Sequence, residues 1–216
     1  MAGLQVTRTQ ISALLGLAVV TWGAWLAFAG TSVGLEHLRP FSLAVGVLVG
    51  AVTLFNLYLW RLPVFRSVLA DRPILVGGWR VEIESNFVDQ STGQRKVVDA
   101  YYLIRQTYLH TSIRVFTKET TSKTQCVQLV KSEDGEWTLQ GTYLDTPDIA
   151  LRARSSIHFG AFWLLLTGNP VSSFRGQYWT DRDTKGSVRS NAHFPSAKFG
   201  DFATAARLFG DASILR

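Results

Sequence analysis

Two uncharged stretches decide the fold of this chain: ISALLGLAVVTWGAWLAFA at residues 11–29 and FSLAVGVLVGAVTLFNLYLW at residues 41–60. Each has the roughly 20 apolar residues that a helix needs to cross the ~30 Å hydrocarbon core of a bilayer. Backbone polar groups in that core must hydrogen-bond within the segment, so we expect both stretches to be helical. Neither stretch carries the polar stripe that is typical of a helix on a soluble core. The sequence therefore predicts a two-helix transmembrane hairpin over residues 1–60.

Basic residues close to the second stretch predict the orientation of this hairpin. Arg61, Arg66 and Arg72 follow residue 60, and Lys and Arg near a span favour the cytoplasmic side. With two spans both termini are then cytoplasmic, and residues 30–40 form the outer connection. The alternative of a cleaved signal peptide stays open, because Ala27-Phe28-Ala29 has the A-x-A form of a cleavage site.

Small residues recur along both predicted spans. Gly16, Gly23 and Ala27 lie in the first, and Gly46 and Gly50 form a GxxxG in the second. Small residues let helix backbones approach closely in lipid, where no hydrophobic drive favours association. They serve either the packing of the two helices of one chain or the association of several chains.

The remaining chain is long enough for one further domain. Residues 61–72 are expected to be a juxtamembrane linker, in which Pro63 opens a short helix, and residues 73–216 a cytosolic domain. The net charge of +6 and the pI near 9.7 suit an anionic leaflet or a phosphate-bearing ligand, and do not indicate a nucleic acid polymer. One cysteine, Cys126, excludes an intramolecular disulfide.

From residue 74 the hydrophobic pattern changes to alternation. Trp79, Val81 and Ile83 alternate with charged residues, which is typical of a half-buried strand. Similar patterns between turn residues predict strands over residues 97–106, 109–119, 122–131, 136–144, 150–167, 172–183 and 186–194. About eight antiparallel strands favour an all-β, up-and-down, lipocalin-like barrel that holds side chains or one small ligand, with a two-sheet sandwich as the alternative.

A short helix is expected after the last strand. Residues 196–208 place Phe199, Phe202 and Ala206 on one helical face, and Ser196 or Asp201 would cap its start. We expect this helix to pack against the barrel.

The sequence gives little support for an enzyme. The four histidines are far apart, none has metal-ligand spacing with a second His or with Cys126, and no catalytic motif is present. The acidic residues, Asp145 among them, are expected mostly in turns or on solvent-facing positions. We therefore expect neither catalysis nor a metal site.

Polar residues on otherwise inward-facing positions predict a binding site instead. Thr117 continues the face of Ile113 and Val115, and Tyr178, Thr180 and Arg182 share one side of their strand. An arginine beside hydroxyls and aromatic rings would bind phosphate and accompany a stacked base. The alternative is that Arg182 is solvated or paired with a neighbouring aspartate, and that Tyr178 only fills the core.

Several strings, in this order after two spans, resemble a known family. They are ILVGGWRVEIES at residues 74–85, YYLIRQTYLHTSIRVFTKETTSKTQ at 101–125, SIHFGAFWLLL at 156–166 and FRGQYWTDRDTKGSV at 174–188. The chain is similar to the two-transmembrane, β-strand-rich effectors associated with SMODS nucleotidyltransferases in bacterial CBASS antiphage defence. The last string departs from the family pattern by one extra residue before Gly186.

The resemblance implies an antiphage effector of the bacterial inner membrane. A partner nucleotidyltransferase would supply a cyclic dinucleotide, which binds the cytosolic barrel, promotes homo-oligomerisation and leads the spans to disrupt the bilayer. No other cofactor is implied. The candidate ligand-binding residues are Arg182 for phosphate, Tyr178 and Tyr143 for stacking, and Thr180, Thr117, Ser122 and Gln106 for polar contacts.

Two other functions remain open from the sequence. Gly77-Gly78-Trp79 resembles the G-x-W opening of lipocalins, which would suit a membrane-tethered module for a lipid or another apolar ligand. Cleavage after Ala29 would instead make the chain an exported protein.

Overall fold

The computed structural model describes residues 12, 16, 19–20, 22–24, 26–28, 30, 35–68, 71–88, 93–153 and 155–211. The chain divides into two compact units. One contains Arg72–Gln106 and His110–Arg216, and the other contains Leu4–Asp71 and Thr107–Leu109.

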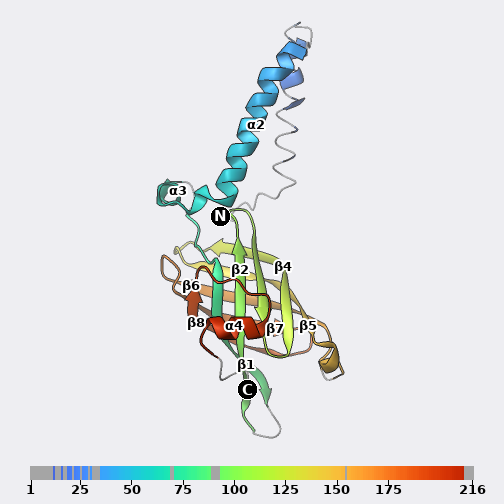
Figure 1. Ribbon diagram of the computed structural model, residues 1–216, viewed down its shortest axis with the longest axis vertical. Coiled ribbons are helices and arrows are strands. Elements are labelled where there is room, and N and C mark those ends of the chain that lie inside the picture. Colours follow the sequence, from blue (N-terminus) through green and yellow to red (C-terminus); the bar gives the residue numbers. More distant parts are fainter. Residues whose placement is uncertain are drawn as a thin grey trace. The chain divides into compact units, whose positions relative to one another are not determined.

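The N-terminal unit is helical. It contains α2 (Leu35–Leu57), the 3-10 helix η1 (Leu59–Arg61) and α3 (Pro63–Val68), and Pro63 opens α3 as predicted (Figure 1). Because α2 begins at Leu35, the predicted connection over residues 30–40 is too long; a run of ordinary helix-forming residues precedes Pro40. Much of the first predicted span lies outside the described residues. Among the described residues, no helix combines the length and the apolar character needed to cross a membrane.

The small residues of this unit face open space. A Cβ atom added at Gly16, Gly23, Gly46 or Gly50 would meet nothing within 4 Å. Ala27, in the same predicted stripe, is exposed. Within the described residues, a side-chain atom at these four glycines would therefore meet no neighbour.

The second unit is an eight-stranded antiparallel barrel (Figure 1). Each strand pairs with the next in sequence, and β8 pairs with β1 to close the sheet. The predicted up-and-down barrel is confirmed, and the sandwich alternative is wrong. The strands are β1 (Gly77–Val88), β2 (Arg95–Gln106), β3 (Thr111–Phe116), β4 (Thr120–Lys131), β5 (Trp137–Pro147), β6 (His158–Thr167), β7 (Ser173–Thr180) and β8 (Lys185–Phe194).

The largest difference from the predicted strands is at the start of β6. A strand was expected from residue 150, but Ile149–Leu151 form the 3-10 helix η2 and β6 begins at His158. The Asp148 side chain accepts a hydrogen bond from the Ala150 amide and caps η2. A capped turn thus replaces the first part of the expected strand.

One end of the barrel is filled by large apolar side chains. Trp79, Leu75 and Phe174 are almost completely buried there, and the Trp79 indole Nε1 donates to the Leu75 carbonyl oxygen at 2.9 Å. The strand that carries Trp79 starts at Gly77, which has φ +123° and lies where a Cβ would be 2.5 Å from the Phe194 carbonyl oxygen. Only glycine fits this position.

The C-terminal helix α4 (Phe202–Leu208) covers the outer face of β2 (Figure 1). Tyr101 and Leu103, which alternate with interior residues of β2, are buried against this C-terminal segment. Of the two caps expected, Asp201 is the one used: its carboxylate accepts from the Thr204 amide at 2.8 Å.

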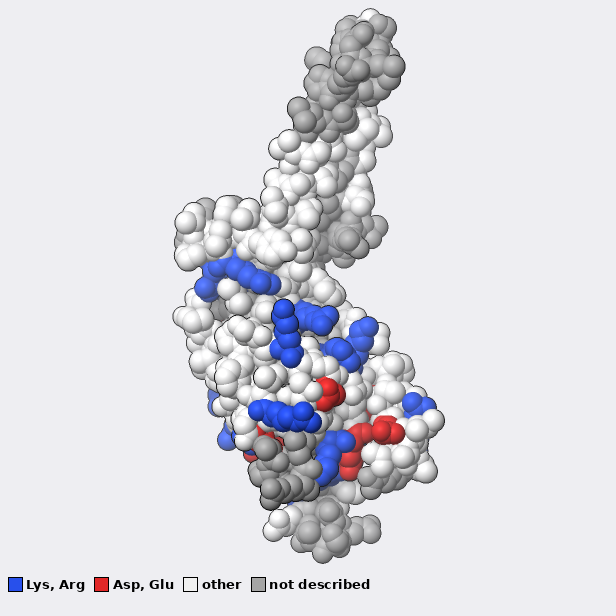
Figure 2. Space-filling view, in the orientation of Figure 1, with Lys and Arg blue, Asp and Glu red and all other residues white. Residues whose placement is uncertain are grey.

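Asp211 fixes the chain after α4 to the barrel wall. The Tyr101 hydroxyl donates to its carboxylate at 2.8 Å, and Arg80 forms an ion pair with it at 2.9 Å. Burial, and then the bond to Asp211, raises the pKa of Tyr101. Figure 2 shows more Lys and Arg than Asp and Glu on the face drawn, in keeping with the net charge of +6.

Candidate functional site

The end of the barrel opposite Trp79 is hollow. A cavity of about 860 Å³ lies where β1, β3, β5 and β7 end and the even-numbered strands begin. Its volume falls within the ~300–1,000 Å³ of small-molecule sites in proteins. The cavity therefore has the size of a ligand site.

Inward-facing residues become more polar toward this opening. Along β7 the inward side chains run from Phe174, through Gly176 and Tyr178, to Thr180. Because strand residues alternate between faces, this order was predictable once the inward face was known. The apolar half is packed core, and the polar half surrounds the cavity.

Two tyrosine rings on the cavity wall lie against glycines of neighbouring strands. Tyr143 is opposite Gly160, where an added Cβ would be 2.2 Å from the Tyr143 ring. Tyr178 is opposite Gly186, where a Cβ would be 2.8 Å from the Tyr178 ring. Because Gly160 and Gly186 have no side chains, there is room for each ring against the neighbouring strand. Both rings are thereby held as flat apolar surfaces on which a base would stack.

These two phenols stay protonated at neutral pH. Burial is the main cause that raises the pKa of Tyr143, with the neighbouring Tyr178 and Asp145 acting in the same direction and Arg182 opposing them. Burial also raises the pKa of Tyr178, against a hydrogen bond with Ser85. The wall therefore adds no negative charge of its own.

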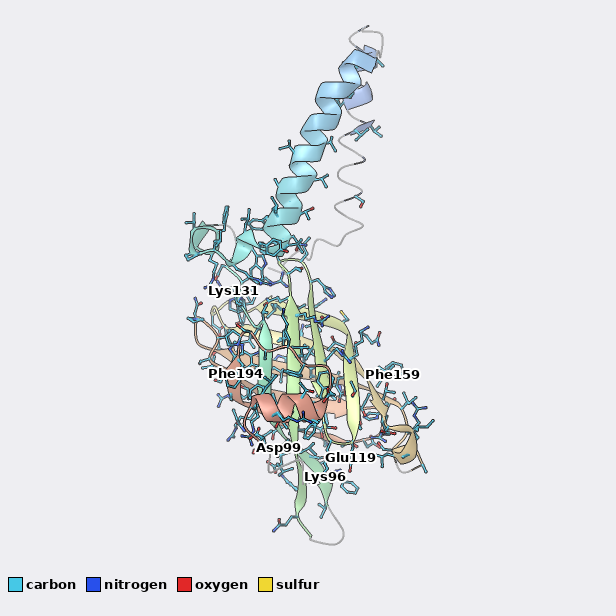
Figure 3. The ribbon with its side chains drawn as sticks, viewed as in Figure 1. Lys96, Asp99, Glu119, Lys131, Phe159 and Phe194 are labelled. Carbon is cyan, nitrogen blue, oxygen red and sulfur yellow. The ribbon has the colours of Figure 1, made fainter. Side chains whose placement is uncertain are left out.

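Basic side chains stand at the cavity opening. Arg182 is exposed on the β7–β8 turn, and its Nη1 donates to Ser155 Oγ at 3.3 Å and to the Ser156 carbonyl oxygen at 3.4 Å. Lys96 pairs with Glu119 at 3.4 Å; Figure 3 labels both. The Arg182 guanidinium thus links the β7–β8 turn to the loop before β6, and no ion pair with the adjacent aspartates is seen among the described residues. Its remaining N–H groups are placed to bind an anion.

The two predicted threonines shape the rim. Thr117 Oγ1 accepts from the Thr120 amide at 2.9 Å, and Thr180 Oγ1 accepts from the Arg182 amide at 3.2 Å. Each hydroxyl therefore closes a turn next to the cavity. A ligand could use only the donor and the lone pair that these hydrogen bonds do not occupy.

A buried polar row crosses the cavity wall, and only one of its three members was predicted. Ser122 on β4 is opposite Asp145 on β5, and Asp145 is opposite His158 on β6. All three line the cavity and are buried. The expectation that Asp145 lies in a turn or faces solvent is wrong, because β5 extends to Pro147 by pairing with the start of β4. His158 points inward.

This row does not have the arrangement of a hydrolytic triad. Ser122 Oγ donates directly to Asp145 Oδ1, and His158 Nδ1 is 3.7 Å from Asp145 Oδ2. In a catalytic triad the histidine lies between the nucleophile and the carboxylate, whereas here the carboxylate is in the middle. Among the described residues there is also no group of three potential metal ligands.

Six of the seven candidate ligand-binding residues line this cavity: Thr117, Ser122, Tyr143, Tyr178, Thr180 and Arg182. Gln106 does not. It lies at the filled end, where its side chain accepts from the Leu75 amide and donates to the Pro73 carbonyl oxygen, both at 2.9 Å. Asp145, His158 and Lys96 are among the lining residues that the sequence did not single out, although Asp145 lies two positions after Tyr143 and so on the same face.

Residues 70–191, more than half of the chain, match the protein family described as Cap15, cyclic dinucleotide receptor domain. The matched segment contains β1 to β7, the larger part of β8 and every candidate ligand-binding residue. No curated protein matches the chain.

Proposed function

The chain belongs to the Cap15 cyclic dinucleotide receptor family of CBASS effectors, and from this we propose that the cavity around Tyr143 and Tyr178 is the place where the cyclic dinucleotide binds. The supporting observation is the hollow end itself: about 860 Å³ with two wall-mounted phenol rings and basic side chains at its opening. A cyclic dinucleotide has two flat bases and two phosphates, and the site offers surfaces for both.

Each part of the site has a distinct role in this proposal. The rings of Tyr143 and Tyr178 stack on bases, a contact worth about 1–3 kcal/mol per base. Arg182 at the rim donates charge-assisted hydrogen bonds to a phosphate. Lys96, also at the rim, is paired with Glu119 and would contact a phosphate only by exchanging that partner.

The proposed response to the ligand takes place in the membrane. The chain is anchored in the bacterial inner membrane by residues 11–29 and 41–60, with both termini in the cytoplasm. A partner nucleotidyltransferase supplies the ligand, bound chains associate, and their spans disrupt the bilayer. The open faces at Gly16, Gly23, Gly46 and Gly50 support association between chains, because no intrachain atom fills them within the described residues. The ligand drives this step only if it binds the assembled state more tightly.

The proposal is tested by titrating the full-length protein, in detergent micelles, with cyclic di-GMP, cyclic di-AMP and cyclic di-UMP while following thermal unfolding. A ligand at 100 times its Kd should stabilise the barrel by about 2.7 kcal/mol. Arg182→Ala should lower the affinity about 10-fold or more, since it removes a charge-assisted hydrogen bond. Arg175→Ala, at an exposed position outside the cavity lining, is the matched control and should bind normally.

A second candidate ligand is a fatty acid, because Ile113, Val115 and Phe162 give the cavity an apolar part. Stabilisation by a fatty acid with no response to the three cyclic dinucleotides would replace the proposed function with this one.

A further inference from the structure

The cavity proposed to take a doubly negative ligand contains a buried carboxylate. Asp145 is 5% exposed, and its neighbours Ser122 and His158 are 6% and 7% exposed. A negative charge at this place weakens the binding of any anion unless it gains a hydrogen bond from the ligand. The carboxylate therefore needs an explanation that phosphate binding does not give.

The position of Asp145 is fixed by the register of three strands. Ser122, Asp145 and His158 are directly opposite one another on β4, β5 and β6. The hydroxyl of Ser122 donates to Oδ1 and so sets the plane of the carboxylate. A side chain held in this way is preorganised to recognise a defined chemical group.

The second oxygen of this carboxylate is left for a ligand. His158 Nδ1 lies 3.1 Å from the Ser156 carbonyl oxygen, and because a carbonyl only accepts, Nδ1 carries the proton and donates it there. Its distance of 3.7 Å from Asp145 Oδ2 is beyond the usual limit of a hydrogen bond. Within the described residues, Ser122 is the side chain that hydrogen-bonds this carboxylate.

Asp145 also lies beside a stacking surface. Tyr143 is two residues earlier on β5, so both side chains point into the cavity about 7 Å apart along the strand. A base stacked on the Tyr143 ring would present its hydrogen-bonding edge toward Asp145. Nucleobases carry N–H donors on that edge, whereas phosphates and ribose ring oxygens only accept; the ribose hydroxyl is the ligand's other donor, and it is the same whichever base is present.

We propose that Asp145, oriented by Ser122, reads the base of the cyclic dinucleotide by accepting a hydrogen bond from an N–H donor on the base edge. The inference rests on the proposed function and assigns its specificity: rim cations bind the phosphates, and the buried carboxylate selects the base. Bases that direct a ring N–H or an amino group at Oδ2 are favoured. Edges that present only acceptors are rejected, because a carboxylate facing an acceptor loses its hydrogen bonds and gains repulsion.

The test compares relative affinities in full-length protein. Wild type, Asp145→Asn and Arg182→Ala are titrated with cyclic di-GMP, cyclic di-AMP and cyclic di-UMP. Asparagine keeps an oxygen for Ser122 but replaces the other acceptor by an amino donor. Asp145→Asn should therefore change the ratio of affinities between the best and the next ligand about 10-fold or more, while Arg182→Ala should weaken all three ligands by similar factors.

A chemically modified ligand gives a second measurement that needs no folded variant. Methylation of the N–H donor on the base of the best ligand should weaken wild-type binding about 10-fold or more, and this discrimination should be lost in Asp145→Asn. Unchanged affinity ratios in a folded Asp145→Asn, or equal wild-type affinity for the methylated ligand, would overturn the role of Asp145. If the wild-type protein binds none of the three ligands, the proposed function is itself rejected, and the role of Asp145 falls with it.

Discussion

At the scale of single residues, His193 makes the filled end of the barrel sensitive to pH. Its ring stacks on Trp79 with centroids 3.7 Å apart, and Nε2 donates to the Val76 carbonyl oxygen at 3.0 Å. Burial lowers the pKa of His193, with the bond to Val76 opposing the shift. The folded state therefore binds this proton less readily than the unfolded state, whose histidine pKa is about 6.5.

The sign of the resulting prediction follows from proton binding. Where the unfolded state binds more protons, the free energy of unfolding rises with pH. Stability should be unaffected by His193 well above pH ~6.5 and should decrease as the pH falls below that value, until His193 is protonated in the folded state as well. Urea unfolding of wild type and His193→Gln from pH 8 to pH 5 measures this. A variant with the same pH slope as wild type would contradict the prediction.

At the scale of paired strands, the stacking surface on β5 depends on a glycine of β6. In Gly160→Ala the new Cβ would be 2.2 Å from the Tyr143 ring, so the ring must turn away from the wall. We expect the variant to lose about 1–3 kcal/mol of stability and to bind the cyclic dinucleotide about 10-fold more weakly.

Gly200→Ala is the matched control for this change. A Cβ at Gly200 would meet nothing within 4 Å, and this glycine has no positive φ. Both variants are compared by calorimetric unfolding and ligand titration. The assigned role of Tyr143 would be lost if Gly160→Ala proved as stable and bound as tightly as Gly200→Ala.

The strands themselves were largely predictable, because alternation is a local property. Trp79, Val81 and Ile83 identify the inward face of β1 without knowledge of its neighbours, and the same reasoning places Thr180 on the inner face of β7. The site was predictable wherever such a strand continues into the cavity. Gln106 shows the limit, since an inward face alone does not distinguish the hollow end from the filled end.

Asp145 was missed although it lies two residues after Tyr143 on the same face of β5. A charged residue after Leu144 ends the apolar pattern of β5, so the strand was expected to stop before it. Its burial depends on Ser122 and His158, which are 23 and 13 residues away and reach it only through the pairing of β4, β5 and β6. Such pairing is non-local, and the local pattern does not contain it.

For the whole molecule, the proposed topology can be tested with the one cysteine of the chain. Cys126 is exposed on β4 and lies after both predicted spans. If residues after 60 are cytoplasmic, a membrane-impermeant maleimide should leave Cys126 unlabelled in intact cells and label it after the inner membrane is permeabilised.

A control places the reporter on the other side of the membrane. Ser32→Cys combined with Cys126→Ser moves the thiol into the predicted outer connection and should be labelled in intact cells. Labelling of Cys126 before permeabilisation would contradict the orientation and, with it, access to a ligand made in the cytoplasm.

The pairing of β8 with β1 limits how this protein can assemble. An open sheet offers a row of free amides and carbonyls to which a strand of another chain can add. Each of the eight described strands is instead paired on both sides over at least part of its length, because the ladder continues around the circumference. Strand addition between copies is therefore limited to short stretches with one neighbour, such as the part of β4 that follows its pairing with β3. Most contacts between the barrels of neighbouring copies would then be made by side chains.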